Sequence, residues 1–343
     1  MRSDLRIGLP VVVHDTTSVL VAASELVTDK LLSKYRSLGH VQIGISKWRA
    51  EGLKLAAYDG DLSRIHVPKD ASANWVRAMS DPQLDLGMPL KGPFMALRDD
   101  RADTALLGIR LAKQAHLLPS VLMVETEDVF PDLTLVDLET MRAEIDQTPN
   151  FTLVSVARVP LEVSRDTRVH VFRPADGTEE HYVIEIGQPS RSVPVLARLH
   201  SACFTGDLLG SLKCDCGKQL NHAMRKMADE GGGLLLYLNQ EGRGIGLANK
   251  MRAYALQDQG FDTVEANHRL GFEDDERNFR IGADLLQKLG FDAVRLMTNN
   301  PEKIARMEAC GVSVTERVPL IVGETAENAN YLATKAAKSG HIL

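Results

Sequence analysis

Apolar residues recur along this chain in two patterns: short runs typical of strands, and stripes with the three- and four-residue spacing of helices. In the first part of the chain the two patterns alternate, which predicts an α/β fold. The runs and stripes predict strands over residues 8–13 and 120–125, and helices over residues 20–32, 101–118 and 133–145. Residues 80–93 are rich in proline and glycine and predict a loop.

The second part opens with strand patterns and continues with strands and helices in alternation. Strands are predicted over residues 151–159, 169–172, 181–186, 193–200, 234–238, 293–297 and 312–315, and helices over residues 219–229, 248–257, 281–289 and 301–309. Residues 262–277 lack periodicity and predict an ordered, functional loop. The charged tail after Asn328 predicts a surface helix or a partly disordered end. Residues 146–150 (DQTPN) predict a hinge, so we expect two α/β domains, 1–150 and 151–343.

The composition is that of an ordinary soluble protein, with 343 residues, 44% of them hydrophobic and 25% charged. No apolar run reaches the roughly 18 residues of a membrane span, and the first residues lack the pattern of a secretory signal. The net charge of −6 argues against a nucleic-acid partner but permits a local basic pocket for phosphates. Four cysteines fit a reducing compartment. We expect a cytoplasmic protein that binds neither membrane nor nucleic acid.

Three of the four cysteines lie close together, in the pattern Cys203-x10-Cys214-x-Cys216. This spacing supplies three thiolates without an obvious fourth ligand, and catalytic zinc sites keep one position open for water. A zinc ion lowers the pKa of such a water, so the cluster indicates a metal-activated nucleophile. The alternative is three unrelated buried thiols. His200, just before the cluster, is a fourth ligand, a neighbour that supports the ligands or a packing residue.

A glycine-rich loop, Gln240-Glu-Gly-Arg-Gly-Ile-Gly246, joins a predicted buried strand to a predicted helix. Its glycines permit close backbone approach to a ligand, and the helix N-terminus favours an anion. Arg243 can add a bidentate phosphate contact. A plain strand-to-helix turn explains the loop equally well. Glu241 would repel a phosphate unless it binds a cation, a base edge or a sugar, and a solvated turn residue is its alternative role.

Two further segments combine polar residues with a helix start. Residues 271–277 (GFEDDER) pack four acids against one arginine, which by itself favours a solvated patch that complements a helix dipole. Residues 298–303 (TNNPEK) follow a predicted strand and open a helix, where a phosphate or a polar base can bind. An ordinary N-cap explains these asparagines equally well.

Taken together, these motifs resemble GTP cyclohydrolase II from about residue 151 to the end of the chain. The resemblance rests on six motifs in order: RLHSACFTGD, SLKCDCG, NQEGRGIGL, RAYALQDQGFDTVEANHRLGF, DDER and TNNPEK. It implies a C-terminal mixed-sheet α/β domain and assigns one zinc ion per subunit to Cys203, Cys214 and Cys216.

The resemblance also assigns the other site residues. It makes Asp275 the proton acceptor, Arg277 the nucleophile toward the α-phosphate, and Tyr254 a residue that positions the attacking water or the guanine ring. It assigns contacts with GTP to Arg198, Leu199, His200, Ser201, Gln219, Glu241, Gly242, Arg243, Thr263, Thr298 and Lys303.

The activity that the resemblance implies is hydrolytic opening of the guanine imidazole ring of GTP, the first step of riboflavin biosynthesis. A metal-activated water attacks C8, formate and pyrophosphate leave, and the product is 2,5-diamino-6-(5-phosphoribosylamino)pyrimidin-4(3H)-one. Because a protonated arginine is a poor nucleophile, Arg277 needs a neighbouring carboxylate such as Asp275. Mg²⁺ would neutralise the triphosphate, and the family implies a homodimer.

Two positions depart from the family pattern. Ala202 stands where the family usually has Glu, and Asn239 where it usually has His or Arg. Both flank expected substrate contacts, so two alternatives stay open. The chain either opens the ring of another nucleotide, or it is a catalytically silent regulatory subunit.

The N-terminal half resembles 3,4-dihydroxy-2-butanone 4-phosphate synthase through LPVVVHDTTSVLVAASELVT and RADTALLGIRLAKQAHLLPSVLMVE. That enzyme needs an acid-rich loop to bind Mg²⁺, whereas the stretch that begins at Asp15 has one acid. Its Gly-His-Thr-Glu turn is replaced by Arg101-Ala-Asp-Thr104. We therefore expect a shortened, inactive domain that serves in dimerisation or covers the cyclohydrolase site.

Overall fold

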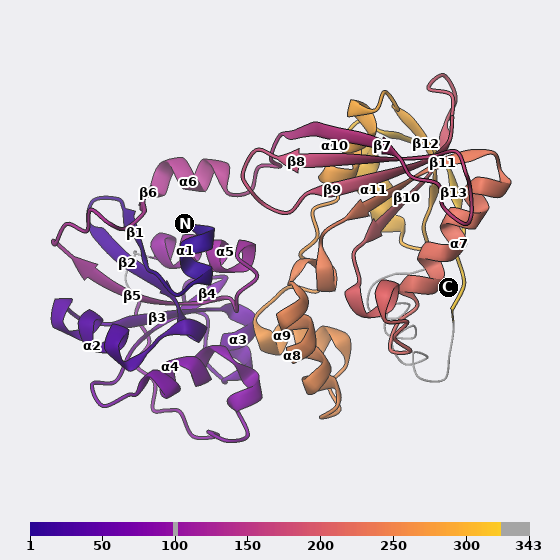
Figure 1. Ribbon diagram of the computed structural model, residues 1–343. Helices are drawn as coiled ribbons and strands as arrows, with labels where there is room; N and C mark the ends of the chain where they lie inside the picture. The colour runs from indigo at the N-terminus through magenta and orange to yellow at the C-terminus, as the bar shows by residue number, and fades with distance from the viewer. Residues whose placement is uncertain (99–101, 324–343) are drawn as a thin grey trace. The chain divides into compact units, whose positions relative to one another are not determined.

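The computed structural model describes residues 1–98 and 102–323, so Arg101 and the tail after Asn328 lie outside the described part. The chain forms two compact units, and Figure 1 shows the elements of each. Unit 1 consists of Met1–Gln147 and Ile245–Glu276, and unit 2 of Thr148–Gly244 and the chain from Arg277 onward. Across the described ranges, no helix has the length and apolar character needed to cross a membrane.

Unit 1 is built on a six-stranded mixed sheet with the order β4-β3-β5-β2-β1-β6. Neighbouring strands pair antiparallel, except that β1 and β6 are parallel. Successive residues of β5 point into two different apolar clusters, so the sheet is buried on both faces. The strands are β1 (Val11–His14), β2 (Ser18–Ala23), β3 (Gln42–Ser46), β4 (Leu62–His66), β5 (Ser120–Thr126) and β6 (Leu135–Asp137).

Helices cover both faces of this sheet. One cluster contains side chains from α1, α5 and α6, and the other contains side chains from α2, α3 and α4. Gly108 lets α5 approach the sheet closely, because a Cβ there would lie 2.9 Å from a Val21 methyl group. The helices are α1 (Arg2–Arg6), α2 (Asp29–Leu38), α3 (Lys47–Gly52), α4 (Ala73–Ser80), α5 (Ala102–Gln114), α6 (Leu138–Glu144), and the 3₁₀ turns η1 (Ser24–Leu26) and η2 (Pro82–Leu84).

The helix predicted over residues 20–32 is wrong. Residues 18–23 form β2, which pairs with both β1 and β5, and the helix begins only at Asp29. The run SVLVAA combines β-branched residues with burial on both faces, so sheet pairing prevails over the helical spacing of its apolar positions.

The units divide the chain differently from the expected boundary at residue 150. Helices α8 (Leu247–Gln257) and α9 (Thr263–Leu270) belong to unit 1, where Leu270 and Phe272 are fully buried in a cluster with Leu118. In Figure 1, α9 lies beside α3, with which it is in contact. The apolar surface of residues 245–276 thus packs on the N-terminal part of the chain rather than on unit 2.

The functional loop predicted over residues 262–277 is a helix in its first half. Asp262 caps α9 by accepting from the backbone N–H groups of Val264 and Glu265, while the Glu265 carboxylate accepts from the Asp262 N–H. This capping box was readable in the sequence as Asp-x-x-Glu. Only the second half, after Gly271, is irregular.

Unit 2 has a seven-stranded mixed sheet, so the α/β class and mixed sheet expected for the C-terminal part are confirmed. The strand order is β13-β12-β10-β11-β9-β8-β7, with parallel pairing from β13 to β11 and antiparallel pairing from β11 to β7. The strands are β7 (Phe151–Arg158), β8 (Thr167–Pro174), β9 (His181–Gly187), β10 (Val195–Ser201), β11 (Gly232–Leu238), β12 (Ala293–Met297) and β13 (Ser313–Val318).

Helices pack on both faces of this second sheet. Helices α10 and α11 contribute to the larger apolar cluster, whose largest side chains include Phe172, Phe279 and Phe291, and α7 packs on a smaller cluster. The helices are α7 (Cys216–Asp229), α10 (Arg280–Lys288) and α11 (Pro301–Ala309), with a π-helical turn η3 (Phe204–Leu208) and a short turn η4 (Glu241–Gly244).

Candidate active site

Three loops that carry predicted site residues follow parallel strands of unit 2. Strand β10 pairs in parallel with β11 on one side and with β12 on the other. The carboxyl ends of parallel strands meet at the same edge of a sheet, where α/β proteins bind their ligands. The loops that follow Ser201, Leu238 and Met297 therefore emerge side by side.

The three cysteines of the predicted zinc site lie together, with their sulfur atoms all within 4.8 Å of one another. The Sγ atoms of Cys203 and Cys214 are 3.7 Å apart. Two thiolates on one tetrahedral zinc ion with bonds of about 2.3 Å would be about 3.8 Å apart. Cys216 begins α7 and supplies the third sulfur. Over the described part of the chain, no other His, Cys, Asp or Glu joins this group.

Gly206 leaves room for these sulfur atoms. A Cβ at this position would lie 2.7 Å from the Cys214 Sγ and 3.0 Å from the Cys203 Sγ. The Gly206 N–H also donates to the Cys203 Sγ at 3.3 Å, a contact that favours the thiolate form. Both the donor set and the space around it fit a zinc ion.

The thiols raise one another's pKa. The hydrogen bond with Cys203 is the main cause that raises the pKa of Cys216 well above its usual value, followed by the contact with Cys214 and by burial. The same partner raises the pKa of Cys214. Three sulfur atoms this close repel one another as thiolates, and a divalent cation between them would reverse that effect.

Asp207 is the polar centre behind Cys203. Its carboxylate accepts from the Cys203 backbone N–H at 3.0 Å and from the Tyr237 hydroxyl at 2.9 Å, and it lies 3.0 Å from the His200 Nε2. Burial lowers the pKa of His200 and is likewise the main cause that raises the pKa of Tyr237. Of the roles left open for His200, the structure supports the one in which it braces the cysteine loop rather than joining the sulfur atoms.

Arg198 is buried at the same edge. Its guanidinium donates to the Met297 carbonyl at 3.0 Å and to the Gln219 Oε1 at 2.5 Å, and Gln219 in turn donates to Asp215. Its Nε has no hydrogen-bond partner within the described residues. Burial lowers the pKa of Arg198 to about 10, so the side chain stays charged at neutral pH.

Phe279 gathers three cationic side chains. The Arg277 guanidinium lies 4.8 Å from the ring centroid, the Lys303 ammonium 5.1 Å and the Arg306 guanidinium 5.5 Å. Such cation–π contacts orient cations without neutralising them, although Arg306 is also ion-paired with Glu302 at 2.5 Å. Arg277 also donates to the Ser201 hydroxyl at 3.4 Å. The arrangement is suited to an anion with several charges.

The loop after β11 is tied to the cysteine loop. The Glu241 carboxylate accepts from the Phe204 N–H at 2.5 Å and from the Gly242 N–H at 2.8 Å. Gly242 and Arg243 both have left-handed backbone conformations, with φ of 64° and 61°. A non-glycine residue in that conformation costs about 1 kcal/mol or more. The structure thus gives Glu241 a bracing role that the sequence did not indicate.

Gly246 serves packing. Its φ is +86°, and a Cβ there would lie 2.8 Å from the His116 Cβ, within unit 1. The expectation that the glycines of this loop permit approach to a ligand therefore does not describe Gly246.

The residues of the loop after β12 are fixed by hydrogen bonds between their own polar groups and the neighbouring backbone. Thr298 is buried and accepts from the Asn300 N–H at 3.0 Å, and Asn300 caps α11. The Lys303 Nζ donates to the Leu199 carbonyl at 3.2 Å, so the lysine is held across β10. Both the predicted N-cap and a basic group at this edge are present.

Three predicted site residues belong to unit 1. Tyr254 lies in α8, where the Lys250 Nζ is 5.8 Å from its ring centroid. Thr263 opens α9 and accepts from the Gln257 side-chain amide at 3.2 Å. Asp275 lies in the acidic segment that ends this part of the chain. The other predicted site residues belong to unit 2.

Sequence reasoning missed three residues. Asp207 stands within the RLHSACFTGD motif, so its place beside the cysteines was a signal. Nothing in the sequence indicates a functional role for Tyr237 or Phe279, because an aromatic residue in or beside an apolar run is predicted to be part of the hydrophobic core.

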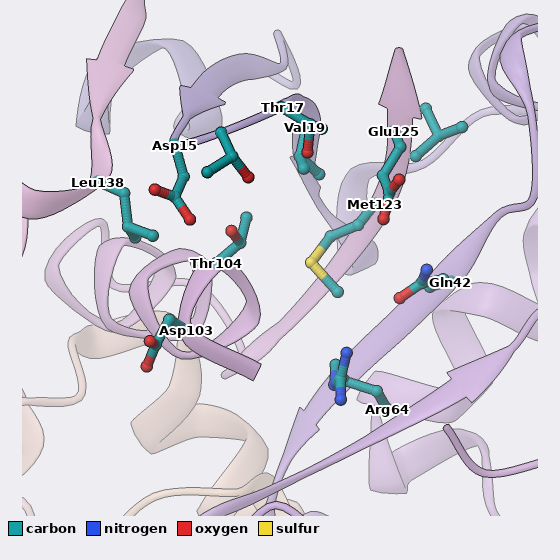
Figure 2. A pocket seen from close by; sticks show the side chains of 12 residues that line it. Asp15, Thr17, Val19, Gln42, Arg64, Asp103, Thr104, Met123, Glu125 and Leu138 are labelled. Carbon is teal, nitrogen blue, oxygen red and sulfur yellow. The ribbon is translucent and has the colours of Figure 1, made fainter. Parts of the chain in front are cut away.

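Unit 1 contains a pocket of its own, with a volume of about 130 Å³. Figure 2 shows Met123 reaching into it between Asp15 and Gln42. Its lining includes Asp15 and Asp103, which come from the two segments in which the sequence departs from the synthase pattern. In the described ranges, the cysteines are the one group of at least three such ligands within 4.8 Å, so these carboxylates do not converge in that way.

Comparison with known proteins shows which family the chain resembles. The family described as GTP cyclohydrolase II matches residues 153–319. A GTP cyclohydrolase-2 from Azospirillum brasilense is 43% identical over 313 residues, covering 88% of this chain and 81% of that protein. One from Escherichia fergusonii is 60% identical over 164 residues, covering 48% of this chain and 83% of that protein.

A solved structure of a two-domain 3,4-dihydroxy-2-butanone 4-phosphate synthase from A. baumannii aligns over 92% of this chain and 98% of its own. The sequence identity is 13% and the TM-score is 0.31, a likeness too low to bear on the fold.

Proposed function

The chain belongs to the GTP cyclohydrolase II family, and we propose that it opens the guanine imidazole ring of GTP by hydrolysis. Formate and pyrophosphate leave, and 2,5-diamino-6-(5-phosphoribosylamino)pyrimidin-4(3H)-one remains, the first intermediate of riboflavin biosynthesis. The observation that carries this proposal is the convergence of three thiols at the edge of unit 2 where Arg198 and Lys303 are also held.

We propose that Cys203, Cys214 and Cys216 hold one zinc ion per subunit, since their sulfur atoms and the space beside Gly206 fit it. Zinc in such a site acts as a Lewis acid and lowers the pKa of a coordinated water. The protein's own part is to keep the sulfur atoms in place. Asp207 does this by accepting from the Cys203 N–H, and Glu241 by accepting from the Phe204 N–H.

His200 keeps a defined tautomer in this scheme. Its Nε2 faces the Asp207 carboxylate, so the ring carries its proton on Nε2 and leaves Nδ1 as an acceptor. Because burial lowers the pKa of His200, the ring stays neutral as GTP binds. We propose that His200 contacts the substrate through this acceptor.

The cations on this edge would bind the triphosphate together with Mg²⁺. Arg198 and Lys303 are buried and already oriented by carbonyl groups of the neighbouring strands, so little side-chain entropy is lost on binding. We propose that Arg277 attacks the α-phosphorus, so that a P–N bond forms as the bond to the bridging oxygen of pyrophosphate breaks. Water later cleaves the P–N bond, which frees the arginine and leaves the 5-phosphate on the product. The proton that Arg277 loses passes to a carboxylate, for which the resemblance names Asp275, and Tyr254 positions the water or the ring.

One of the two departures from the family pattern has a structural role. The Asn239 side-chain amide donates to the Glu180 carbonyl at 2.5 Å, and the Asn239 backbone N–H donates to the His181 Nδ1 at 2.9 Å. An asparagine that forms hydrogen bonds with Glu180 and His181, at the start of β9, does not by itself favour another substrate. GTP is therefore the substrate that we propose.

The proposal is tested by incubating purified protein with GTP, Mg²⁺ and Zn²⁺ and measuring formate, the pyrimidinone product and bound zinc. We expect equal amounts of formate and product, and about one zinc ion per chain. Cys214→Ser should abolish both turnover and stoichiometric zinc, whereas Cys310→Ser, at the cysteine outside the cluster, should keep both. A zinc-loaded, folded chain that turns over other nucleotides but not GTP would contradict the proposal.

For the N-terminal part we propose the absence of butanone phosphate synthase activity. Asp15 and Asp103 line the pocket of unit 1, but Asp103 is paired with Arg142 at 2.8 Å, and no group of three carboxylates in the described residues gathers around one position. The full chain should yield no 3,4-dihydroxy-2-butanone 4-phosphate from ribulose 5-phosphate with Mg²⁺. Formation of that product at an enzymatic rate would overturn this part.

A further inference from the structure

The acidic segment 271–276 (GFEDDE) is held by residues of the N-terminal part of unit 1. Four acids in sequence repel one another, so such a segment keeps one conformation only if other groups fix it. The start of the segment is fixed by a buried hydrogen bond, in which the Ser46 hydroxyl donates to the Gly271 carbonyl at 2.7 Å. Phe272 is fully buried beside it.

Trp48 fixes the middle of the segment. Its indole N–H donates to the Glu273 carboxylate at 2.8 Å, and its ring stacks on His268 at 3.7 Å with an interplanar angle of 4°. The His268 Nε2 lies 2.6 Å from the Asp274 carboxylate. One tryptophan thus contacts one acid directly and supports the histidine that contacts the next.

Lys113 fixes the end of the segment. Its ammonium lies 2.6 Å from the Glu276 carboxylate, and both side chains are about four-fifths buried, at 22% and 20% exposure. The same Glu276 oxygen accepts from the Glu273 backbone N–H at 2.9 Å. Lys113 therefore closes a turn that runs from Glu273 to Glu276, and Asp275 lies inside it.

We propose that Ser46, Trp48 and Lys113 are positioning residues for the cyclohydrolase reaction. They contact Gly271, Glu273 and Glu276 respectively, and so fix the backbone on both sides of Asp275. The inference rests on the proposed function, in which Asp275 takes up a proton. It gives the N-terminal part a task in catalysis without any chemistry of its own.

The test compares five variants of the full chain with the wild type: two test variants, a matched control for each, and one conservative rescue variant. Trp48→Phe removes the indole donor but keeps a ring for stacking, and Lys113→Met removes the charge. Trp75→Phe is the matched control for the first, because the Trp75 N–H donates to the Lys91 carbonyl at 3.0 Å, away from the segment. Arg110→Met is the control for the second, since Arg110 lies one turn earlier on α5 and pairs with Asp146 at 2.8 Å.

The two test variants should lower kcat for GTP about 10-fold to 100-fold while KM changes less than about twofold, because misplacement of a catalytic group costs rate rather than ground-state binding. Lys113→Arg should restore kcat to within about threefold of the wild type. Both controls should keep the wild-type kcat. Amide hydrogen exchange in the peptide 271–277 should accelerate in the two test variants and not in the controls.

Wild-type turnover with test variants indistinguishable from their controls in kcat and exchange would overturn the inference and leave the proposed function intact. Faster exchange with unchanged kcat would also overturn it, since the segment would then be held for stability alone. A wild-type chain that does not turn over GTP would overturn the proposed function, and the positioning role with it. Loss of kcat with faster exchange would support both.

Discussion

The proposed zinc site depends on a residue without a side chain. Gly206 lies where a Cβ would be 2.7 Å from the Cys214 Sγ and 2.9 Å from the Cys216 Cβ. Neither neighbour is the far end of a flexible chain, so the cysteine loop would have to shift to admit a methyl group.

Gly206→Ala should therefore weaken zinc binding at least 10-fold and lower turnover in proportion to the zinc lost. The measurement is competition for zinc with a chromophoric chelator, read beside formate release at saturating metal. Gly52→Ala is the matched control, because a Cβ at Gly52 meets nothing within 4 Å. Wild-type zinc affinity in Gly206→Ala would contradict the packing argument.

His181 links the stability of unit 2 to pH. It is 4% exposed, its Nδ1 accepts from the Asn239 N–H at 2.9 Å, and burial lowers its pKa to about 4. The unfolded chain binds a proton at this residue with a pKa of about 6.5. Since the folded pKa is the lower one, the stabilisation is complete above about pH 6.5 and is lost as pH falls toward 4.

Because of this residue, lowering the pH from 7 to 5 should reduce the free energy of unfolding by about 2 kcal/mol. Denaturant titrations of the wild type and of His181→Gln at both pH values measure the effect. The glutamine keeps an acceptor for Asn239 but does not titrate, so its stability should fall by about 2 kcal/mol less than that of the wild type. An equal fall in both proteins would show that another group is responsible.

At the level of single elements, α9 depends on its first residue. The Asp262 carboxylate accepts from two backbone N–H groups, of Val264 and Glu265, at 2.8 Å and 3.0 Å. Asp262→Ala should destabilise the chain by about 1 kcal/mol, seen as a lower midpoint of chemical unfolding. Asp262→Asn, which retains an oxygen acceptor, should recover most of this loss, and a null effect of the alanine would show that packing alone holds the helix.

The strands and helices of unit 2 could be predicted closely because each is bounded by turn residues and has one strong period. The helix over residues 301–309, with its asparagine cap and proline in the first turn, is confirmed. The failures lie where local patterns conflict with distant pairing. SVLVAA becomes a strand because β1 and β5 flank it, and no local feature of residues 18–23 reveals those partners.

The site shows the same limit. The three cysteines could be brought together from spacing and motif order alone, because two of them are separated by one residue. The brace formed by Asp207, Tyr237 and Glu241 could not, because its hydrogen bonds join residues that are 30 and 37 positions apart in the sequence. Neither could the tie between Trp48 and Glu273, which are 225 residues apart.

At the scale of the whole molecule, the exposure of strand β7 indicates how the chain forms an oligomer. It is the edge strand of the second sheet, and after Phe151 all its residues are exposed. Leu153, Val154 and Val156 are 43%, 41% and 45% exposed, so apolar side chains are solvated on both faces of one edge strand. Such an edge calls for a partner.

We propose that a second copy of the chain covers β7 in a homodimer. Light scattering after size exclusion should give about twice the chain mass for the wild type, and Val154→Lys combined with Val156→Lys should shift it toward the monomer. The same double charge at Val129 and Leu135, exposed residues of unit 1, is the control and should leave the mass unchanged. A monomeric wild type at micromolar concentration would refute the proposal.

Because unit 1 consists of Met1–Gln147 and Ile245–Glu276, it cannot complete its folding on the ribosome until the second segment has been synthesised. The unit's last segment emerges 129 residues after Gln147, from 147 to 276, which at about 5–20 residues per second is roughly 6–26 seconds. During that interval the apolar surface around Leu118 stays exposed to solvent, because residues 245–276, which cover it, are synthesised only after β7 to β11. A nascent chain arrested before residue 245 should therefore bind chaperones through its N-terminal part, and one arrested well after residue 276 should release them.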